Sequence, residues 1–129
     1  MYGLWAKIRY GYPIYFDRSK KKLIDTLFDL ANGDINTITD LGGIYKVHGA
    51  YSFYTIQKYH VSKVMEIDTK LTREYLELCK KFTQITSLEA NFADAEAISK
   101  IENADALYLF DVLLHQVDPD WDEILELYS

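Results

Sequence analysis

The chain has 129 residues, a length that fits one compact domain. Nearly half of the residues are hydrophobic (49%), so the chain can bury a core and global disorder is excluded. Its formal net charge of -6 argues against a general nucleic-acid-binding protein, because phosphate contacts need a basic surface.

The single cysteine, Cys79, cannot build a disulfide framework or a thiolate metal cluster within one chain. A reducing compartment is the simplest explanation of this cysteine usage. The N-terminus carries no apolar run of signal-peptide length, and no stretch is long enough to span a membrane. We therefore expect a cytoplasmic protein that does not bind membranes. Three scattered histidines give no metal-ligand spacing, so we expect no metal site.

Residues 1–33 are predicted to form an aromatic lead-in followed by a helix. The Gly11-Tyr12-Pro13 break forbids a continuous helix from the N-terminus. Asp17 or Ser19 can then cap a helix with apolar side chains at helical spacing, and Asn32-Gly33 ends it.

From residue 34 onward, predicted strands and helices alternate. The predicted strands are Ile35–Leu41, Lys63–Asp68, Thr86–Phe92 and Ala106–Leu114. The predicted helices are Gly49–Lys58, one that starts at Asp68 or Thr69, Ala93–Ile101, and a last one after Asp118-Pro119. The apolar pattern of the second helix extends to Ile85, which overlaps the next strand. Strands separated by helices imply a parallel sheet with right-handed crossovers. We therefore predict an α/β fold for residues 34–129: a Rossmann-like parallel sheet with crossover helices, truncated after the fourth strand and preceded by the N-terminal helix.

The double glycine after the first predicted strand is a place where a ligand could approach the backbone. Gly42 and Gly43 can take positive φ and come close to a bound group, although Asp40–Gly43 also fits an ordinary turn. Polar residues at or near the ends of the other strands are Asp68, Asn91 and Asp111. Ligands of such folds bind beyond the carboxyl ends of the strands, so these residues are candidates for one site.

Three segments resemble the N-terminal part of the class I S-adenosylmethionine-dependent methyltransferases. Asp40–Gly43 resembles the family's first motif, Val64–Asp68 its second strand, and Asp105–His115 its fourth strand and exit. The resemblance extends from about Ile35 to Ser129. It departs from the family where Tyr45 replaces a further glycine, which is delayed to Gly49, and in the absence of strands five to seven.

The resemblance implies a transferase: the S-adenosylmethionine-binding portion of a methyltransferase acting on an unidentified, small-molecule acceptor. It implies that Gly42 and Gly43 wrap the methionine part of the cofactor. Asp68 would bind the ribose hydroxyls, cap the following helix, or do both. Asp40 would order the loop or reach the cofactor amine.

The remaining candidate residues follow the third and fourth strands. Asn91 and Asp94 would lie near the adenine, although Asp94 could instead be an acid that favours a helix N-terminus. Asp111 would face the cofactor. His115 could act as a general base on the acceptor, and a packed or solvent-facing histidine is the alternative.

A sheet that ends at the fourth strand leaves an apolar edge that must be paired or covered. We therefore expect a fragment of a longer enzyme, half of a split enzyme that pairs with its C-terminal half, or a homo-oligomer. The alternative function is a non-catalytic, acidic interaction or assembly protein that keeps the half-fold. Its binding surface would be the fourth strand and the aromatic N-terminus.

Overall fold

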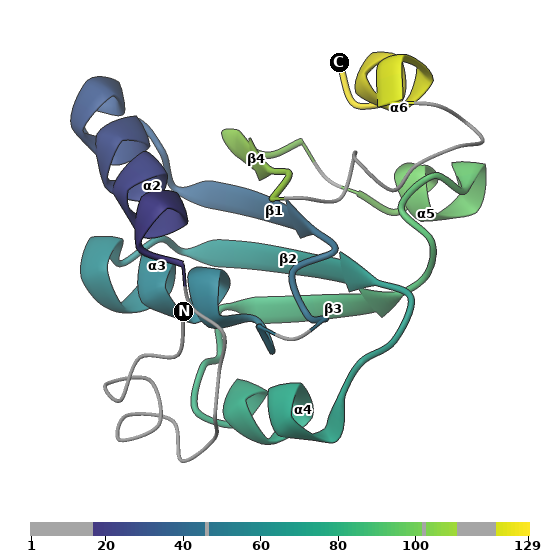
Figure 1. Cartoon of the computed structure of the whole chain (residues 1–129), viewed down its shortest axis with the longest axis horizontal. Helices are drawn as coiled ribbons and strands as arrows, with labels where there is room; N and C mark the ends of the chain where they lie inside the picture. The colour runs from purple at the N-terminus through teal and green to yellow at the C-terminus, as the bar shows by residue number, and fades with distance from the viewer. Residues whose placement is uncertain (1–16, 46, 102, 111–120) are drawn as a thin grey trace.

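A computed structural model describes residues 17–45, 47–101, 103–110 and 121–129, and it contains one four-stranded parallel sheet (Figure 1). The strands are β1 (Thr37–Leu41), β2 (Lys63–Asp68), β3 (Ile85–Glu89) and β4 (Ala106–Tyr108). The helices are α2 (Arg18–Ala31), α3 (Ala50–Tyr59), α4 (Arg73–Cys79), α5 (Ala95–Ser99) and α6 (Trp121–Leu127). This architecture confirms the predicted α/β, Rossmann-like arrangement with an N-terminal helix.

The strand order is β3-β2-β1-β4, which creates a switch point in the middle of the sheet. The chain moves outward from β1 through β2 to β3 and then returns to the other side of β1 as β4. Ligands of open α/β sheets bind beyond the carboxyl ends of the strands at such a reversal. The turn that follows β1 therefore lies where the fold favours a ligand.

The predicted N-terminal helix is confirmed as α2. Asp17 caps it, because its Oδ1 accepts hydrogen bonds from the backbone nitrogens of Ser19 (2.7 Å) and Lys20 (3.3 Å). Asn32 ends the helix in the left-handed conformation. Ile24 and Phe28 of α2 join the same hydrophobic core as α3 and the sheet.

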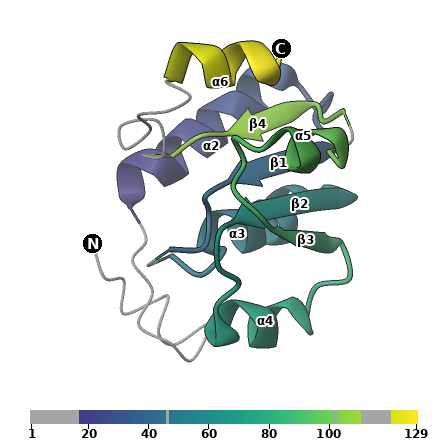
Figure 2. The same ribbon diagram turned by 90° about the vertical axis from the view of Figure 1, so that its right-hand side faces the viewer.

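Helices α2 and α3 lie together on one side of the sheet, with α5 on the other side (Figures 1 and 2). Asp25 of α2 joins the two helices, accepting hydrogen bonds from the hydroxyls of Tyr54 (2.5 Å) and Tyr59 (2.6 Å) and from Lys58 Nζ (2.9 Å). Burial raises the pKa of Asp25, but these three donors and Lys21 outweigh burial and hold that pKa well below its usual value. A charged Asp25 therefore stabilises the α2–α3 pair.

The edge strand β4 is short but fixed at its start. The Oδ2 atom of Asp105 accepts hydrogen bonds from the backbone nitrogens of Asn36 (2.8 Å) and Thr37 (2.9 Å). The hydroxyl of Thr37 adds a third donor at 3.0 Å. These contacts set the register of β4 against β1. The strand was predicted to continue to Leu114, but it ends at Tyr108, and Leu109 and Phe110 are not part of it. Residues 111–114 lie outside the described part of the chain.

The helix after β2 was predicted wrongly. It was expected to start at Asp68 or Thr69, whereas α4 begins at Arg73. The hydroxyl of Thr72 caps it by accepting from the backbone nitrogen of Tyr75 (3.3 Å). The helix also ends earlier than the apolar pattern indicated, at Cys79. Ile85, expected to overlap the next strand, begins β3. The apolar spacing that suggested a longer helix comes from a helix, a turn and a strand that all face the core.

Among the described residues, no helix is both long enough and apolar enough to cross a membrane. The aromatic lead-in of residues 1–16 and the Asp118-Pro119 start of the last helix lie outside the described residues.

Candidate functional site

The loop between β1 and α3 is closed on itself and tied to β2. The backbone nitrogen of Gly42, a residue with φ of 71°, donates to the carbonyl oxygen of Ile67 (2.7 Å). The nitrogen of Gly49 donates to the carbonyl of Gly43 (2.9 Å), and that of His48 to the carbonyl of Ile44 (2.7 Å). The expectation that a glycine takes positive φ at this turn is confirmed at Gly42.

Gly43 is required for a different reason, namely the side chains beneath it. A Cβ atom at this position would lie 2.4 Å from Asp40 Oδ2 and 2.7 Å from Glu66 Oε2. Those separations are far shorter than van der Waals contact. Only glycine therefore fits over these two carboxyl groups.

Asp40 and Glu66 form a buried acidic pair with Ser52. They are register partners on β1 and β2, with 1% and 0% of their surfaces exposed. Ser52 Oγ on α3 lies 3.1 Å from Asp40 Oδ2 and 2.5 Å from Glu66 Oε1. In the described part of the chain, Asp40 Oδ1 and Glu66 Oε2 are buried and contact no hydrogen-bond partner.

Burial dominates the electrostatics of this pair. Burial, with a smaller contribution from the charge of Asp68, raises the pKa of Asp40 to about 6, against the hydrogen bonds from Glu66 and Ser52. Burial and the charge of Asp40 raise the pKa of Glu66 well above its usual value. Two acids this close in a dry site share a proton at neutral pH, which we assign to Glu66.

The pair belongs to a row of polar side chains that crosses the sheet. Strand register places Ser87, Glu66, Asp40 and Tyr108 next to one another, one from each strand. At one end, Tyr75 of α4 lies 2.5 Å from Ser87, hydroxyl to hydroxyl. At the other end, Tyr108 is 2.8 Å from the hydroxyl of Thr55 on α3. The row is thus closed by hydrogen bonds at both ends.

Asp68 holds the loop from the tip of β2. Its Oδ2 accepts from the backbone nitrogens of Ile44 (3.0 Å) and Tyr45 (3.3 Å), and its Oδ1 from the nitrogen of Thr69 (2.7 Å). A longer contact of 3.4 Å joins Oδ1 to the hydroxyl of Thr69. These donors fill the four acceptor positions of a carboxylate, so a ribose hydroxyl would have to replace the longest contact. The capping role predicted for Asp68 is wrong, because Thr72 caps α4.

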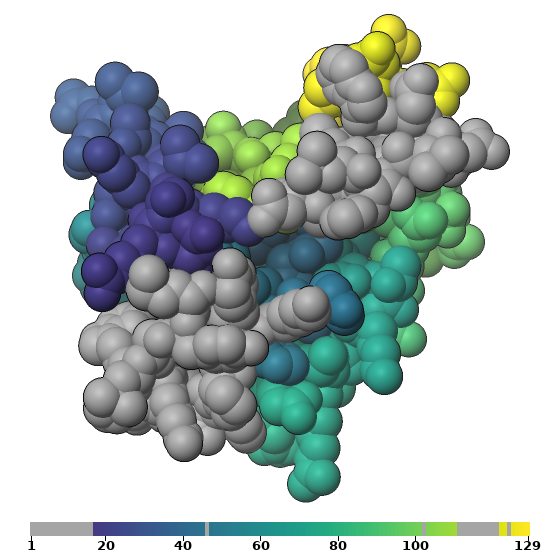
Figure 3. Space-filling view, in the orientation of Figure 1, coloured from purple at the N-terminus to yellow at the C-terminus, as the bar shows by residue number. Residues whose placement is uncertain are grey.

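The loop reaches the surface beside the residues around α4 (Figure 3). Tyr45 is 74% exposed there, and His48 Nδ1 lies 2.9 Å from the hydroxyl of Thr72. Gly49 starts α3 with φ of 77°, and a Cβ on it would lie 2.8 Å from the ring of Tyr75. The delayed glycine therefore serves close packing of α3 against α4.

The polar residues after β3 are arranged differently. Asn91 Oδ1 accepts from the backbone nitrogen of Ala93 (2.9 Å), which makes a local turn. Asp94 precedes α5 and its side chain makes no capping hydrogen bond. Both are exposed, and within the described ranges no hydrogen bond links them to Asp40 or Asp68. Asp111 and His115 lie outside the described residues.

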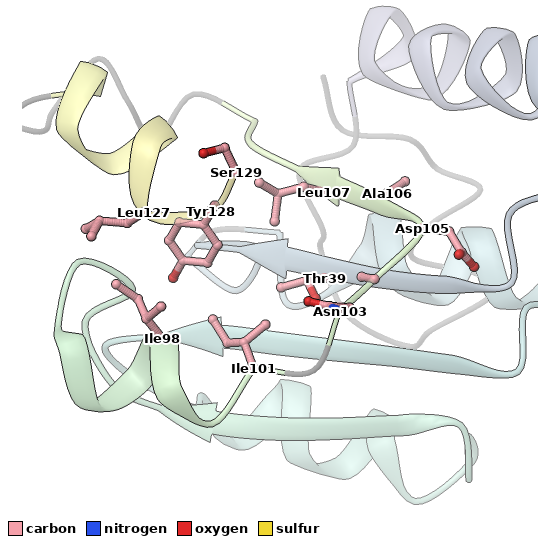
Figure 4. Close-up of a pocket in the computed structure, with 11 residues that line it drawn as sticks. Thr39, Ile98, Ile101, Asn103, Asp105, Ala106, Leu107, Leu127, Tyr128 and Ser129 are labelled. Carbon is pink, nitrogen blue, oxygen red and sulfur yellow. The ribbon is translucent and has the colours of Figure 1, made fainter.

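A separate cavity of about 550 Å³ lies between the β1–β4 edge, α5 and the end of α6 (Figure 4). Ile98 and Ile101 line it from α5 and the turn after it, Leu107 from β4, and Leu127 and Tyr128 from the C-terminal end. It contains none of the residues predicted for the cofactor site. Its walls are mixed apolar and polar, and no buried charged group points into it in the described residues.

Two residues of the acidic site were missed at the sequence level, Glu66 and Ser52. For Glu66, the sequence signal that could have indicated a site residue was an acid between the apolar residues Met65 and Ile67 of a predicted strand. Ser52 gave none, because only the packing of α3 on the sheet brings it to the pair.

No cluster of three or more metal-ligating side chains occurs in the part of the chain that the structure describes. No protein-family model matches the chain, and no curated protein matches it.

Proposed function

We propose that this chain is the S-adenosylmethionine-binding portion of a methyltransferase that acts on an unidentified, small-molecule acceptor. The observation that carries the proposal is the acidic glycine turn at the switch point of the sheet. Asp40, Glu66 and Asp68 gather under and beside Gly42-Gly43, beyond or near the carboxyl ends of two neighbouring strands.

The charge of the turn favours this cofactor over a phosphate-bearing nucleotide. A pyrophosphate needs free backbone N–H groups at a glycine loop, and the two that follow Gly43 already donate to Asp68. Neighbouring carboxylates would also repel a phosphate. S-adenosylmethionine carries a sulfonium, an ammonium and a ribose but no phosphate, so acidic surroundings attract it.

Three residues would hold the cofactor. Gly42 and the loop it opens offer backbone surface without side chains, and Asp68 would accept from a ribose hydroxyl in place of Thr69. Asp40 is buried under Gly43, so it would order the loop that the cofactor contacts. The cofactor supplies an activated methyl group, so the protein's tasks are to align the acceptor and exclude water.

The roles of the other predicted residues stay proposals. Asn91 and Asp94 would lie near the adenine, which requires a ligand that reaches the surface after β3. Asp111 would face the cofactor, and His115 would be the general base. We also propose a cytoplasmic location and no nucleic-acid partner.

Calorimetric titration of the 129-residue chain with S-adenosylhomocysteine tests the proposal. We expect micromolar or tighter binding of this product, and none of NAD or ATP at the same concentrations. Binding of NAD or ATP instead would replace the proposal with a phosphate-bearing ligand. No heat and no thermal shift with any of the three would remove cofactor binding from this chain.

The alternative is a non-catalytic interaction or assembly protein, and one observation favours it. β4 has a strand on one side only in the described sheet, and exposed Leu125 and Leu127 lie near the cavity beside it. A homo-oligomer or a pairing with a C-terminal half would cover this edge. Light scattering distinguishes the states: a dimer or larger assembly that does not bind S-adenosylhomocysteine favours the assembly role, and a monomer that binds it favours the enzyme.

A further inference from the structure

Ser52 contacts both Asp40 and Glu66. If both acids are ionised, these two contacts have only one hydrogen atom between them. Ser52 Oγ lies within hydrogen-bond distance of Asp40 Oδ2 (3.1 Å) and of Glu66 Oε1 (2.5 Å). A hydroxyl has a single proton, so it donates to only one of them. The second contact needs a proton on a carboxyl group, and the shorter contact, to Glu66, is where a carboxyl O–H would donate to Ser52.

The position of this proton matters because the glycine loop sits directly on the pair. Gly43 covers both carboxyl groups so closely that a Cβ would overlap them. The same loop is anchored from the side by Asp68, through the nitrogens of Ile44 and Tyr45. Two facing negative charges under Gly43 would repel each other and draw in water, and the loop is the part of the structure that must move to admit it.

We propose that Glu66 is a positioning residue for the glycine loop, and that the loop keeps its ligand-binding shape only while the pair of Glu66 and Asp40 retains a proton. This inference rests on the proposed function for its ligand, but its effect on the loop does not. No contact between Glu66 and the cofactor is required.

The other groups that face the pair, within the described residues, do not supply a compensating positive charge. Asp68 at the end of β2 adds a negative one. Tyr108 of β4 and Tyr75 of α4 are neutral, because burial raises the pKa of both hydroxyls above the usual value. Ser52 and Thr55 of α3 do not titrate. The proton shared by the pair is therefore the group that relieves the repulsion.

The test is a pH titration of the full 129-residue chain by NMR, from pH 5 to pH 9. The side-chain carboxyl carbon of Glu66 reports its protonation, and the amides of Gly42, Gly43 and Ile44 report the loop. We expect Glu66 to titrate well above the usual value for a glutamate, and the three amides to shift with the same midpoint. An ordinary midpoint for Glu66, or loop amides that do not follow it, overturns the proposal.

Variants make the assignment specific. Glu66→Gln keeps the shape and a donor but cannot ionise, so the loop amides should lose the titration step that follows Glu66 and keep only the step of Asp40. Glu96→Gln is the matched control, because Glu96 lies exposed on α5 and pairs only with Lys100 among described residues; it should leave the titration unchanged. If Glu66→Gln does not fold, the wild-type titration alone decides.

A second arm measures the dissociation constant of S-adenosylhomocysteine over the same pH range. Once the proton is lost, the constant should rise about tenfold per pH unit for the wild-type chain and stay flat for Glu66→Gln. Binding that is independent of pH, with silent loop amides, overturns this inference and leaves the proposed function standing. No binding at any pH, with loop amides that follow Glu66, removes the proposed function and leaves Glu66 as the loop-positioning residue.

Discussion

The ends of β1 and β2 differ from the end of β3 in what their polar side chains do. Asp40, Glu66 and Asp68 are buried and bind across elements, to α3 and to the backbone of the loop. Asn91 and Asp94 are exposed, and Asn91 bonds only two residues along the chain. Burying several acids together costs free energy, so such a cluster is typical of a functional site. A hydrogen bond within an exposed turn, as at Asn91, carries no such cost.

The largest effect should come from Gly43→Ala. Its Cβ would overlap both Asp40 and Glu66, and we expect a loss of about 3 kcal/mol in the free energy of unfolding and in that of S-adenosylhomocysteine binding. Gly33→Ala is the matched control, because Gly33 has φ of 88° but nothing within 4 Å of an added Cβ. It should cost only about 1 kcal/mol of backbone strain. Urea unfolding measures both, and equal losses would contradict the role of the acidic pair.

The next effect is a fall in stability as pH rises. The pKa of Asp40 is raised in the folded chain from 3.8 to about 6, so its contribution is present below 3.8 and is lost as pH rises through about 6. The loss should be up to about 1.4 kcal/mol per pH unit in this window. Asp25 has the opposite effect on stability, at more acidic pH. Its pKa is lowered in the folded chain, so its stabilising contribution is lost as pH falls.

Urea unfolding at half-unit steps from pH 4 to pH 8 measures this slope. Asp40→Asn should flatten it, whereas Asp34→Asn, at an exposed position after α2, should not. A wild-type stability that rises steadily across pH 4 to 6 would show that the pair is not protonated in the folded chain.

A smaller effect is expected for Asp68→Ala. The change leaves the backbone nitrogens of Ile44, Tyr45 and Thr69 without their acceptor, which should cost about 2 kcal/mol and weaken S-adenosylhomocysteine binding at least tenfold. Asp94→Ala is the control, since that side chain is exposed and makes no capping bond. It should change stability by less than about 0.5 kcal/mol. Similar effects of the two changes would erase the difference between the two regions.

The smallest effect should come from Asn91→Ala, which removes one local hydrogen bond to the nitrogen of Ala93. We expect a loss of about 0.5 kcal/mol in the free energy of unfolding. The proposed place of Asn91 near the adenine also predicts that affinity for S-adenosylhomocysteine, measured by calorimetry, falls about fivefold, as for one lost hydrogen bond of about 1 kcal/mol. An affinity that stays within twofold of the wild type would remove Asn91 from the ligand site.

The sequence predicted the sheet well because strand signals are local. The predicted strand Lys63–Asp68 matches β2 at both ends. The alternation of predicted strands and helices after residue 33 gave the observed α/β order. Helix α4 was predicted too long, because side chains of a helix, a turn and a strand can share one core at helical spacing. The true start of α4 follows Thr72, whose hydroxyl caps it.

The sequence predicted only those residues of the candidate site that lie at the ends of strands. Asp40, Gly42 and Asp68 were placed at the correct edge, since parallel strands end together. Glu66 becomes a neighbour of Asp40 only through strand register, and Ser52 only through the packing of α3. Such relations depend on three-dimensional alignment, and the chain order does not contain them.

The overlap at Gly43 also has an evolutionary consequence. A side chain at position 43 is excluded by the carboxyl groups of residues 40 and 66, and nothing else need forbid it, because its φ is not among the positive ones. Relatives that carry alanine or serine at 43 should therefore carry smaller or apolar residues at 40 and 66. Substitution at these three positions should be correlated, and lineages that lose the acidic pair are free to lose the glycine.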